Sequence, residues 1–139
     1  MKEKQETAAF WKTFGLAALL WAALAAGSEL LFPSSAAAPA GAAGLLRSCL
    51  VLPVAEELVF RGAALRLLRP LGRNAAILGQ AVLFAAAHGS AEAKIYAFAM
   101  GLVFGWAVEH TGRLWPGMGL HCLNNCIVLA GCLAERGLG

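Results

Sequence analysis

Residues Ala8–Leu31, with the sequence AAFWKTFGLAALLWAALAAGSELL, decide the class of fold. A helix of this length can cross a hydrocarbon core of about 30 Å, so we expect it to form a first membrane span. The basic start of the chain and the alanine-rich Ala22–Ala26 also fit a cleaved signal peptide, and this alternative stays open.

The composition of the whole chain argues against a water-soluble fold. Hydrophobic residues make up 60% of the 139 residues and charged residues 14%, whereas soluble proteins have roughly 45–50% and about 25%. The apolar faces therefore need lipid, or one another, as their surroundings. The net charge of +3 comes from scattered arginines and a short basic start, without the basic stripe of a nucleic-acid surface. We expect the lipid bilayer, and no nucleic acid, as a partner.

The remaining apolar stretches complete an all-α fold. We predict a loop over Phe32–Gly44 and then four helices, over Gly44–Leu68, Asn74–His88, Ile95–His110 and Pro116–Ala134. Pro70 and Gly72 should end the first of these four helices, and Pro53 should kink it. The predicted fold is a polytopic transmembrane helical bundle of about five membrane-spanning helices. We treat 1–139 as a single membrane domain, with an N-terminal span and loop in 1–43 and a motif-bearing core in 44–134.

Basic residues are divided unevenly between the two sides of such a bundle. One side would carry Lys2, Lys4, Lys12, Arg66, Arg69, Arg73 and Arg113, and the other Arg47, Lys94 and Arg136. The positive-inside rule then predicts a cytoplasmic N-terminus and an external C-terminus. A composition rich in alanine, glycine and leucine suggests a bacterial chain, so the predicted location is a bacterial inner (plasma) membrane.

Three polar clusters interrupt the apolar segments, where ionisable groups are costly and indicate function. The first is Glu56-Glu57-Leu58-Val59-Phe60-Arg61, in the middle of the predicted second helix. Glu57 and Arg61 stand four positions apart, share a helix face and can form an ion pair. Glu56 is offset by about 100°, which leaves it free to face a cavity. The structural alternative is that both glutamates only join helices through Arg61.

The second and third clusters contribute histidines. Phe84-Ala85-Ala86-Ala87-His88 ends the predicted third span, and a lone histidine there is more often a packed core residue than a functional one. His121 and Asn125 stand four apart on the predicted fifth helix and project together, whereas Asn124 points elsewhere and should bond a neighbouring helix. Together, a buried Glu beside a His can take a proton from water, while a second His and an amide can stabilise an oxyanion.

The three clusters, in this order on successive hydrophobic segments, resemble the signature motifs of the CAAX-protease and bacteriocin-processing family. The resemblance covers about Leu45–Ala130. It implies an intramembrane endopeptidase that hydrolyses a peptide bond in a membrane-associated substrate, such as a leader, a sorting tail or a CAAX-like tail. Carried onto this chain, it implies that Glu56 and His88 activate water, that His121 and Asn125 hold the oxyanion, and that Glu57 and Arg61 support the site.

Several alternatives stay open at this stage. Glu56, His88 and His121 could bind zinc, although a metal-free reaction is favoured because an asparagine amide suits an oxyanion better than a metal. The four cysteines are interpreted as small core residues. A non-catalytic immunity or partner-binding protein of the same fold, or a small proton-coupled transporter, would also explain buried ionisable groups.

One geometric difficulty accompanies the predicted site. In a simple five-helix bundle, His88 and His121 would lie at depths that differ by about 12 Å. The segment Arg113–Gly119 would have to dip into the membrane, or the third helix would have to tilt, for the two histidines to meet.

Overall fold

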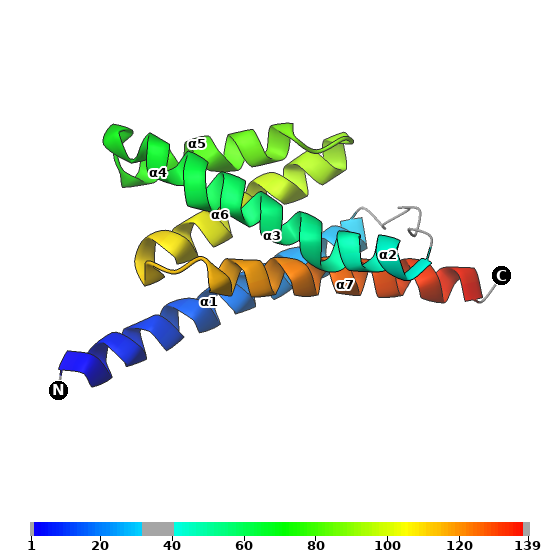
Figure 1. Cartoon of the computed structure of the whole chain (residues 1–139), viewed down its shortest axis with the longest axis horizontal. Helices are drawn as coiled ribbons and strands as arrows, with labels where there is room; N and C mark the ends of the chain where they lie inside the picture. The colour runs from blue at the N-terminus through cyan, green and yellow to red at the C-terminus, as the bar shows by residue number, and fades with distance from the viewer. Residues whose placement is uncertain (1, 32–40, 138–139) are drawn as a thin grey trace.

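The computed structural model describes residues 2–31 and 41–137, and every element in these ranges is helical (Figure 1). The predicted all-α helical bundle is therefore confirmed. The described residues form five long helical stretches. They are α1 Lys2–Leu31, a helical run from Gly41 to Leu71, the antiparallel pair α5 Arg73–Ala86 and α6 Ala91–Thr111, and α7 Trp115–Gly137.

The run from Gly41 to Leu71 carries the first polar cluster and is helical throughout. It is built from α2 Gly41–Leu46, the π-helical η1 Arg47–Val51, α3 Leu52–Glu57, the π-helical η2 Leu58–Ala64, α4 Leu65–Leu68 and the 3-10 turn η3 Arg69–Leu71. The widened turns of η1 end just before α3, which contains Pro53, and the kink at Pro53 stays a prediction. Single π-helical stretches inside helices are frequent at functional sites.

The C-terminal end of this run agrees with the sequence prediction, whereas its N-terminal end does not. Gly72, with a φ of 101°, follows η3 and ends the run as predicted, because glycine tolerates positive φ without a Cβ clash. The run begins at Gly41 and not at Gly44, so the predicted loop is wrong over 41–44. The alanines at 42 and 43 are strong helix formers and extend the helix. The rest of that predicted loop, 32–40, lies outside the described residues.

Glycines let α5 and α6 pack closely. A Cβ at Gly101 would lie 2.8 Å from the Ala81 Cα, and one at Gly105 would meet the Gln80 amide. Gln80 is fully buried and donates through Nε2 to the Gly101 carbonyl oxygen at 2.6 Å. This close approach aligns the second cluster, at the end of α5, with the middle of the bundle.

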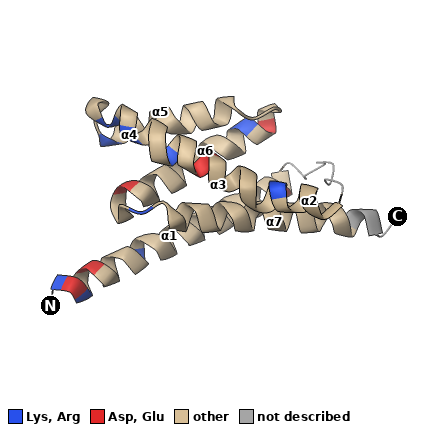
Figure 2. Cartoon of the chain, viewed as in Figure 1, with Lys and Arg blue, Asp and Glu red and all other residues tan. Residues whose placement is uncertain are grey.

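Three of the described helices are long and apolar enough to cross a membrane: α1, α6 and the Trp115–Ala134 part of α7. The predicted third span is shorter than expected, because α5 has 14 residues, or about 21 Å at 1.5 Å per residue. Charged residues gather at the N-terminal end of α1 and around the turn between α4 and α5, while most of α7 carries none (Figure 2). The chain is an integral membrane protein.

The hydrophobic core joins α1 to α5, α6 and α7. Its buried residues are Ala17, Trp21, Phe84, Ala97, Met100, Phe104, Ala107 and Leu120. Phe84 and Phe104 of this core also touch the polar clusters, so the same aromatic rings that close the bundle form the wall of the candidate site.

Candidate active site

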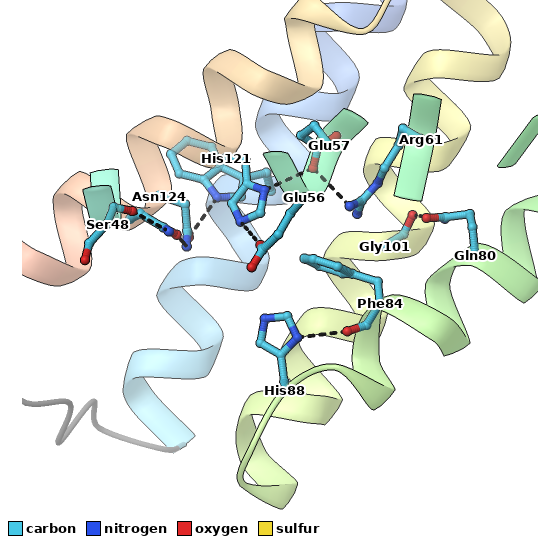
Figure 3. A network of polar contacts seen from close by, with 12 residues as sticks. Ser48, Glu56, Glu57, Arg61, Gln80, Phe84, His88, Gly101, His121 and Asn124 are labelled. Carbon is cyan, nitrogen blue, oxygen red and sulfur yellow. Dashed lines mark hydrogen bonds and ion pairs between the residues drawn. The ribbon is translucent and has the colours of Figure 1, made fainter. Parts of the chain in front are cut away.

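The centre of the site is a carboxylate that contacts both an arginine and a histidine. Glu57 Oε1 lies 3.0 Å from Arg61 Nη1 and 3.0 Å from His121 Nδ1. The Glu57 and Arg61 side chains are fully buried, and the His121 side chain is 5% exposed. The structure thus contains the predicted Glu57–Arg61 pair and adds His121, which comes from α7 (Figure 3).

Aromatic rings enclose the Arg61 guanidinium. Its Cζ lies 4.2 Å from the centre of the Phe84 ring and 5.7 Å from that of Phe104. A cation over a ring face is attracted by the negative π surface. Arg61 makes no hydrogen bond among the described residues, so Glu57 and these rings are what compensate its buried charge. The pair is therefore closed to solvent.

Glu56 differs from Glu57 in access. Its side chain is 36% exposed, and its Oε2 lies 3.5 Å from His121 Nε2. The two nitrogens of His121 thus face two different carboxylates, Glu57 on the inner side and Glu56 on the open side. Of the two carboxylates, only Glu56 is exposed on the outside of the bundle.

Charge balance constrains where the proton lies in this group. Glu57 can only accept a hydrogen bond when ionised, so His121 Nδ1 carries a proton. If His121 Nε2 carries a proton as well, the charges of Arg61, His121 and the two carboxylates sum to zero. His121 Nε2 then has a hydrogen to donate, towards Glu56 or towards an oxygen that develops negative charge.

His88 lies on the other side of Phe84 from Arg61 and His121. Its ring centre is 4.7 Å from that of Phe84, and the His121 ring centre is 5.7 Å from the same ring. His88 Nδ1 lies 2.8 Å from the Phe84 carbonyl oxygen, which can only accept. Nδ1 is therefore the protonated nitrogen, and Nε2 of a neutral ring is left as an acceptor. In Figure 3 the His88 and Glu56 side chains extend towards one another.

The expected depth mismatch between the two histidines is absent, since both contact Phe84. The short α5 and the oblique course of α6 place the start of α7 beside the middle of the bundle (Figure 1). Pro116 and Gly117, at this start, are buried. A Cβ at Gly117 would lie 3.0 Å from Glu57 Oε2, so glycine there is what admits α7 to the site.

Asn125 bonds the helical run from Gly41 to Leu71, the motif helix. Its Nδ2 donates to the Ser48 carbonyl oxygen at 3.0 Å. Leu52, the α-helical donor for that oxygen, bonds Arg47 instead, and the π-helical donor would be the missing N–H of Pro53. Asn125 therefore satisfies a carbonyl that the proline leaves without a helical partner.

Asn124 bonds neighbouring helices, as predicted. Its Oδ1 accepts from Trp21 Nε1 of α1 at 3.1 Å and from the Tyr96 hydroxyl of α6 at 2.6 Å. Sequence reasoning missed Ser48, Trp21 and Tyr96, because none of them belongs to a motif. The only signal for Ser48 was its position five residues before Pro53.

The zinc alternative can be tested against the donor geometry. Within residues 2–31 and 41–134, whose side chains the structure describes, no three His, Cys, Asp or Glu side chains are grouped closely enough to hold a metal ion. Glu56 and His121 face each other, but His88 stands across the Phe84 ring with Nδ1 bonded to its own helix. As arranged here, Glu56, His88 and His121 do not fit a metal.

Fold and site together define a polytopic membrane protein with a buried carboxylate–histidine group inside a helical bundle. Residues 38–127 match the family described as type II CAAX prenyl endopeptidase Rce1-like. The chain belongs to this family, which confirms the resemblance found in the three polar clusters. Searches of curated proteins and of solved structures found no match.

Proposed function

We propose that this protein is an intramembrane endopeptidase in which Glu56 is the general base. The observation that carries the proposal is the contrast between two adjacent carboxylates. Glu57 is fully buried against Arg61 and His121, whereas Glu56 is 36% exposed beside the same histidine. One carboxylate, that of Glu57, is enough to pair with Arg61. The second, that of the exposed Glu56, is therefore available for chemistry.

The proposed reaction begins with a water molecule between Glu56 and His88. Glu56 takes one proton from this water as its oxygen attacks the carbonyl carbon of the scissile bond. The Nε2 lone pair of His88 accepts a hydrogen bond from the same water and orients it. The proton held by Glu56 then passes to the nitrogen of the leaving amine, so that both products are released as neutral molecules before they ionise in solvent.

His121 and Asn125 are proposed to stabilise the tetrahedral oxyanion. His121 Nε2 donates one hydrogen bond, and Glu57 supports the charged ring from its other nitrogen at 3.0 Å. Asn125 Nδ2 uses one hydrogen for Ser48 and keeps the other for the oxyanion. Removing one such donor from an enzyme typically costs about 100- to 1,000-fold in rate.

The proposed substrate is the end of a membrane-associated protein or peptide: a leader, a sorting tail or a CAAX-like tail. Family membership supports this substrate class. We further propose that the protein acts in a bacterial plasma membrane, with its N-terminus in the cytoplasm. The proposed reaction uses the side chains of this chain and no metal.

The direct test is cleavage by the purified protein in liposomes, followed by mass spectrometry. The probes are a farnesylated peptide with a CAAX end and a panel of bacterial leader and sorting-tail peptides. We expect a single cut, and Glu56→Gln should lower its rate by about 100-fold or more. Glu92→Gln removes an exposed carboxylate in the first turn of α6 and serves as the matched control. Wild-type cleavage rates for Glu56→Gln and His88→Ala would refute the proposal.

A further inference from the structure

Four hydrogen bonds connect the N-terminal helix to the motif helix. Trp21 Nε1 and the Tyr96 hydroxyl both donate to Asn124 Oδ1, at 3.1 and 2.6 Å. Asn124 Nδ2 donates to Asn125 Oδ1 at 3.3 Å, and Asn125 Nδ2 donates to the Ser48 carbonyl oxygen at 3.0 Å. This amide relay runs from α1 and α6 through two neighbouring residues of α7 to η1. Figure 3 labels two of its residues, Asn124 and Ser48.

The chemistry at the two ends fixes the orientation of both amides. An indole N–H can only donate, so the Asn124 atom that faces Trp21 is the oxygen. Asn124 therefore presents Nδ2 to Asn125. A carbonyl oxygen can only accept, so Asn125 presents Nδ2 to Ser48 and Oδ1 to Asn124. Rotating either side-chain amide by 180° would place a donor against a donor at one of its contacts and an acceptor against an acceptor at the other.

Burial makes the relay costly to break. Asn124 and Trp21 are each 7% exposed, and Trp21 also belongs to the core cluster. A buried polar group that loses its partner pays its full desolvation cost. Asn124 is accordingly held by two donors on one oxygen, and the orientation that they impose passes to Asn125.

We propose that Trp21, Tyr96 and Asn124 are positioning residues that hold the Asn125 amide ready for the oxyanion. This inference rests on the proposed function, because Asn125 acts there as an oxyanion donor. It also assigns a role to α1, which lies outside the family match over residues 38–127. The N-terminal helix is then a working part of the site and more than a membrane anchor.

The kinetic test compares Trp21→Phe/Tyr96→Phe with Trp11→Phe. The double variant keeps an aromatic side chain at both positions and removes both donors to Asn124, while Trp11→Phe makes the same substitution at an exposed tryptophan of α1. With the farnesylated CAAX peptide, or whichever panel peptide is cleaved, we expect kcat of the double variant to fall about tenfold or more and KM to stay within about twofold. Trp11→Phe should match wild type. A purely structural role would instead lower thermal stability and leave the kcat of the folded fraction unchanged.

A second readout needs no activity. Asn74, Asn124 and Asn125 are the three asparagines of the chain, so ¹⁵N-asparagine labelling gives three side-chain amide signals by NMR in detergent micelles. Asn74 is exposed and serves as the internal reference. We expect the Asn125 amide protons to exchange with solvent at least about tenfold more slowly than those of Asn74, and to lose this protection in the double variant.

The two readouts separate the relay from the proposed function. Wild-type protection of Asn125 in the double variant overturns the relay, and so does an unchanged kcat. If the wild-type protein cleaves no peptide, the proposed function fails, and amide exchange alone decides whether Trp21 and Tyr96 orient Asn125. Glu56→Gln should keep full Asn125 protection, because Glu56 is not part of the relay.

Discussion

Gly117 lies directly against the carboxyl group of Glu57, and a Cβ in its place would come to 3.0 Å from Glu57 Oε2. Glu57 cannot move away, because Arg61 and His121 hold its other oxygen. The absence of a side chain at Gly117 therefore sets how closely α7 approaches the motif helix, and with it the distance from His121 to both carboxylates.

Gly117→Ala should push α7 outwards and lengthen the contact between His121 and Glu57. We expect a loss of stability of about 1 kcal/mol or more and a larger loss of cleavage, measured by thermal unfolding in detergent and by peptide hydrolysis. Gly119→Ala is the control, since a Cβ there meets nothing within 4 Å. Equal behaviour of the two variants would contradict this interpretation.

Among the described residues, Glu57 is the only carboxylate within hydrogen-bonding distance of the buried Arg61 guanidinium. Glu57→Gln leaves Arg61 buried between Phe84 and Phe104 without a counter-charge, which should cost about 3–5 kcal/mol in free energy of unfolding. Removing both charges, in Glu57→Gln/Arg61→Met, should recover much of this loss because a long apolar side chain can fill the same aromatic cage. A double variant less stable than Glu57→Gln alone would rule out charge burial as the cause.

Contacts within one helix could be predicted from the sequence. Glu57 and Arg61 are four residues apart, so helical geometry alone brings them together. The same geometry separated Glu56 from Arg61, but it did not predict the hydrogen bond between the Asn124 and Asn125 side chains. The helix end at Gly72 also follows from local chemistry, since glycine tolerates the positive φ found there.

Contacts between helices could not be predicted in this way. His121 reaches Glu57 across 64 residues, and that contact depends on the short α5 and on the glycines that let α6 and α7 approach. Hydropathy placed the C-terminal end of α5 too late, because the apolar run continues to His88 whereas the helix ends at Ala86. The bond from Asn125 to Ser48 depends on a π-helical register, which no residue pattern in the sequence specifies.

The proposed reaction requires no metal ion. Because His88 Nδ1 bonds the Phe84 carbonyl and the ring stands across Phe84 from His121, we expect hydrolysis to proceed on side chains alone. The cleavage rate should stay within about twofold of its starting value after dialysis against a strong chelator. Elemental analysis of the active protein should find less than one zinc per chain. Loss of activity in chelator, with recovery on adding zinc, would reverse this conclusion.

The bond between Asn125 and Ser48 exists because Pro53 has no N–H to offer that carbonyl. Asn125→Leu should therefore lower the free energy of unfolding by about 1–2 kcal/mol, the cost of a buried carbonyl without a partner. In a Pro53→Ala background the helix regains a donor at position 53, and the same Asn125→Leu change should cost markedly less. Thermal unfolding of the four proteins in detergent gives the coupling energy as a double-mutant cycle. An equal cost of Asn125→Leu in both backgrounds would mean that Asn125 stabilises the bundle by some route other than the carbonyl freed by proline.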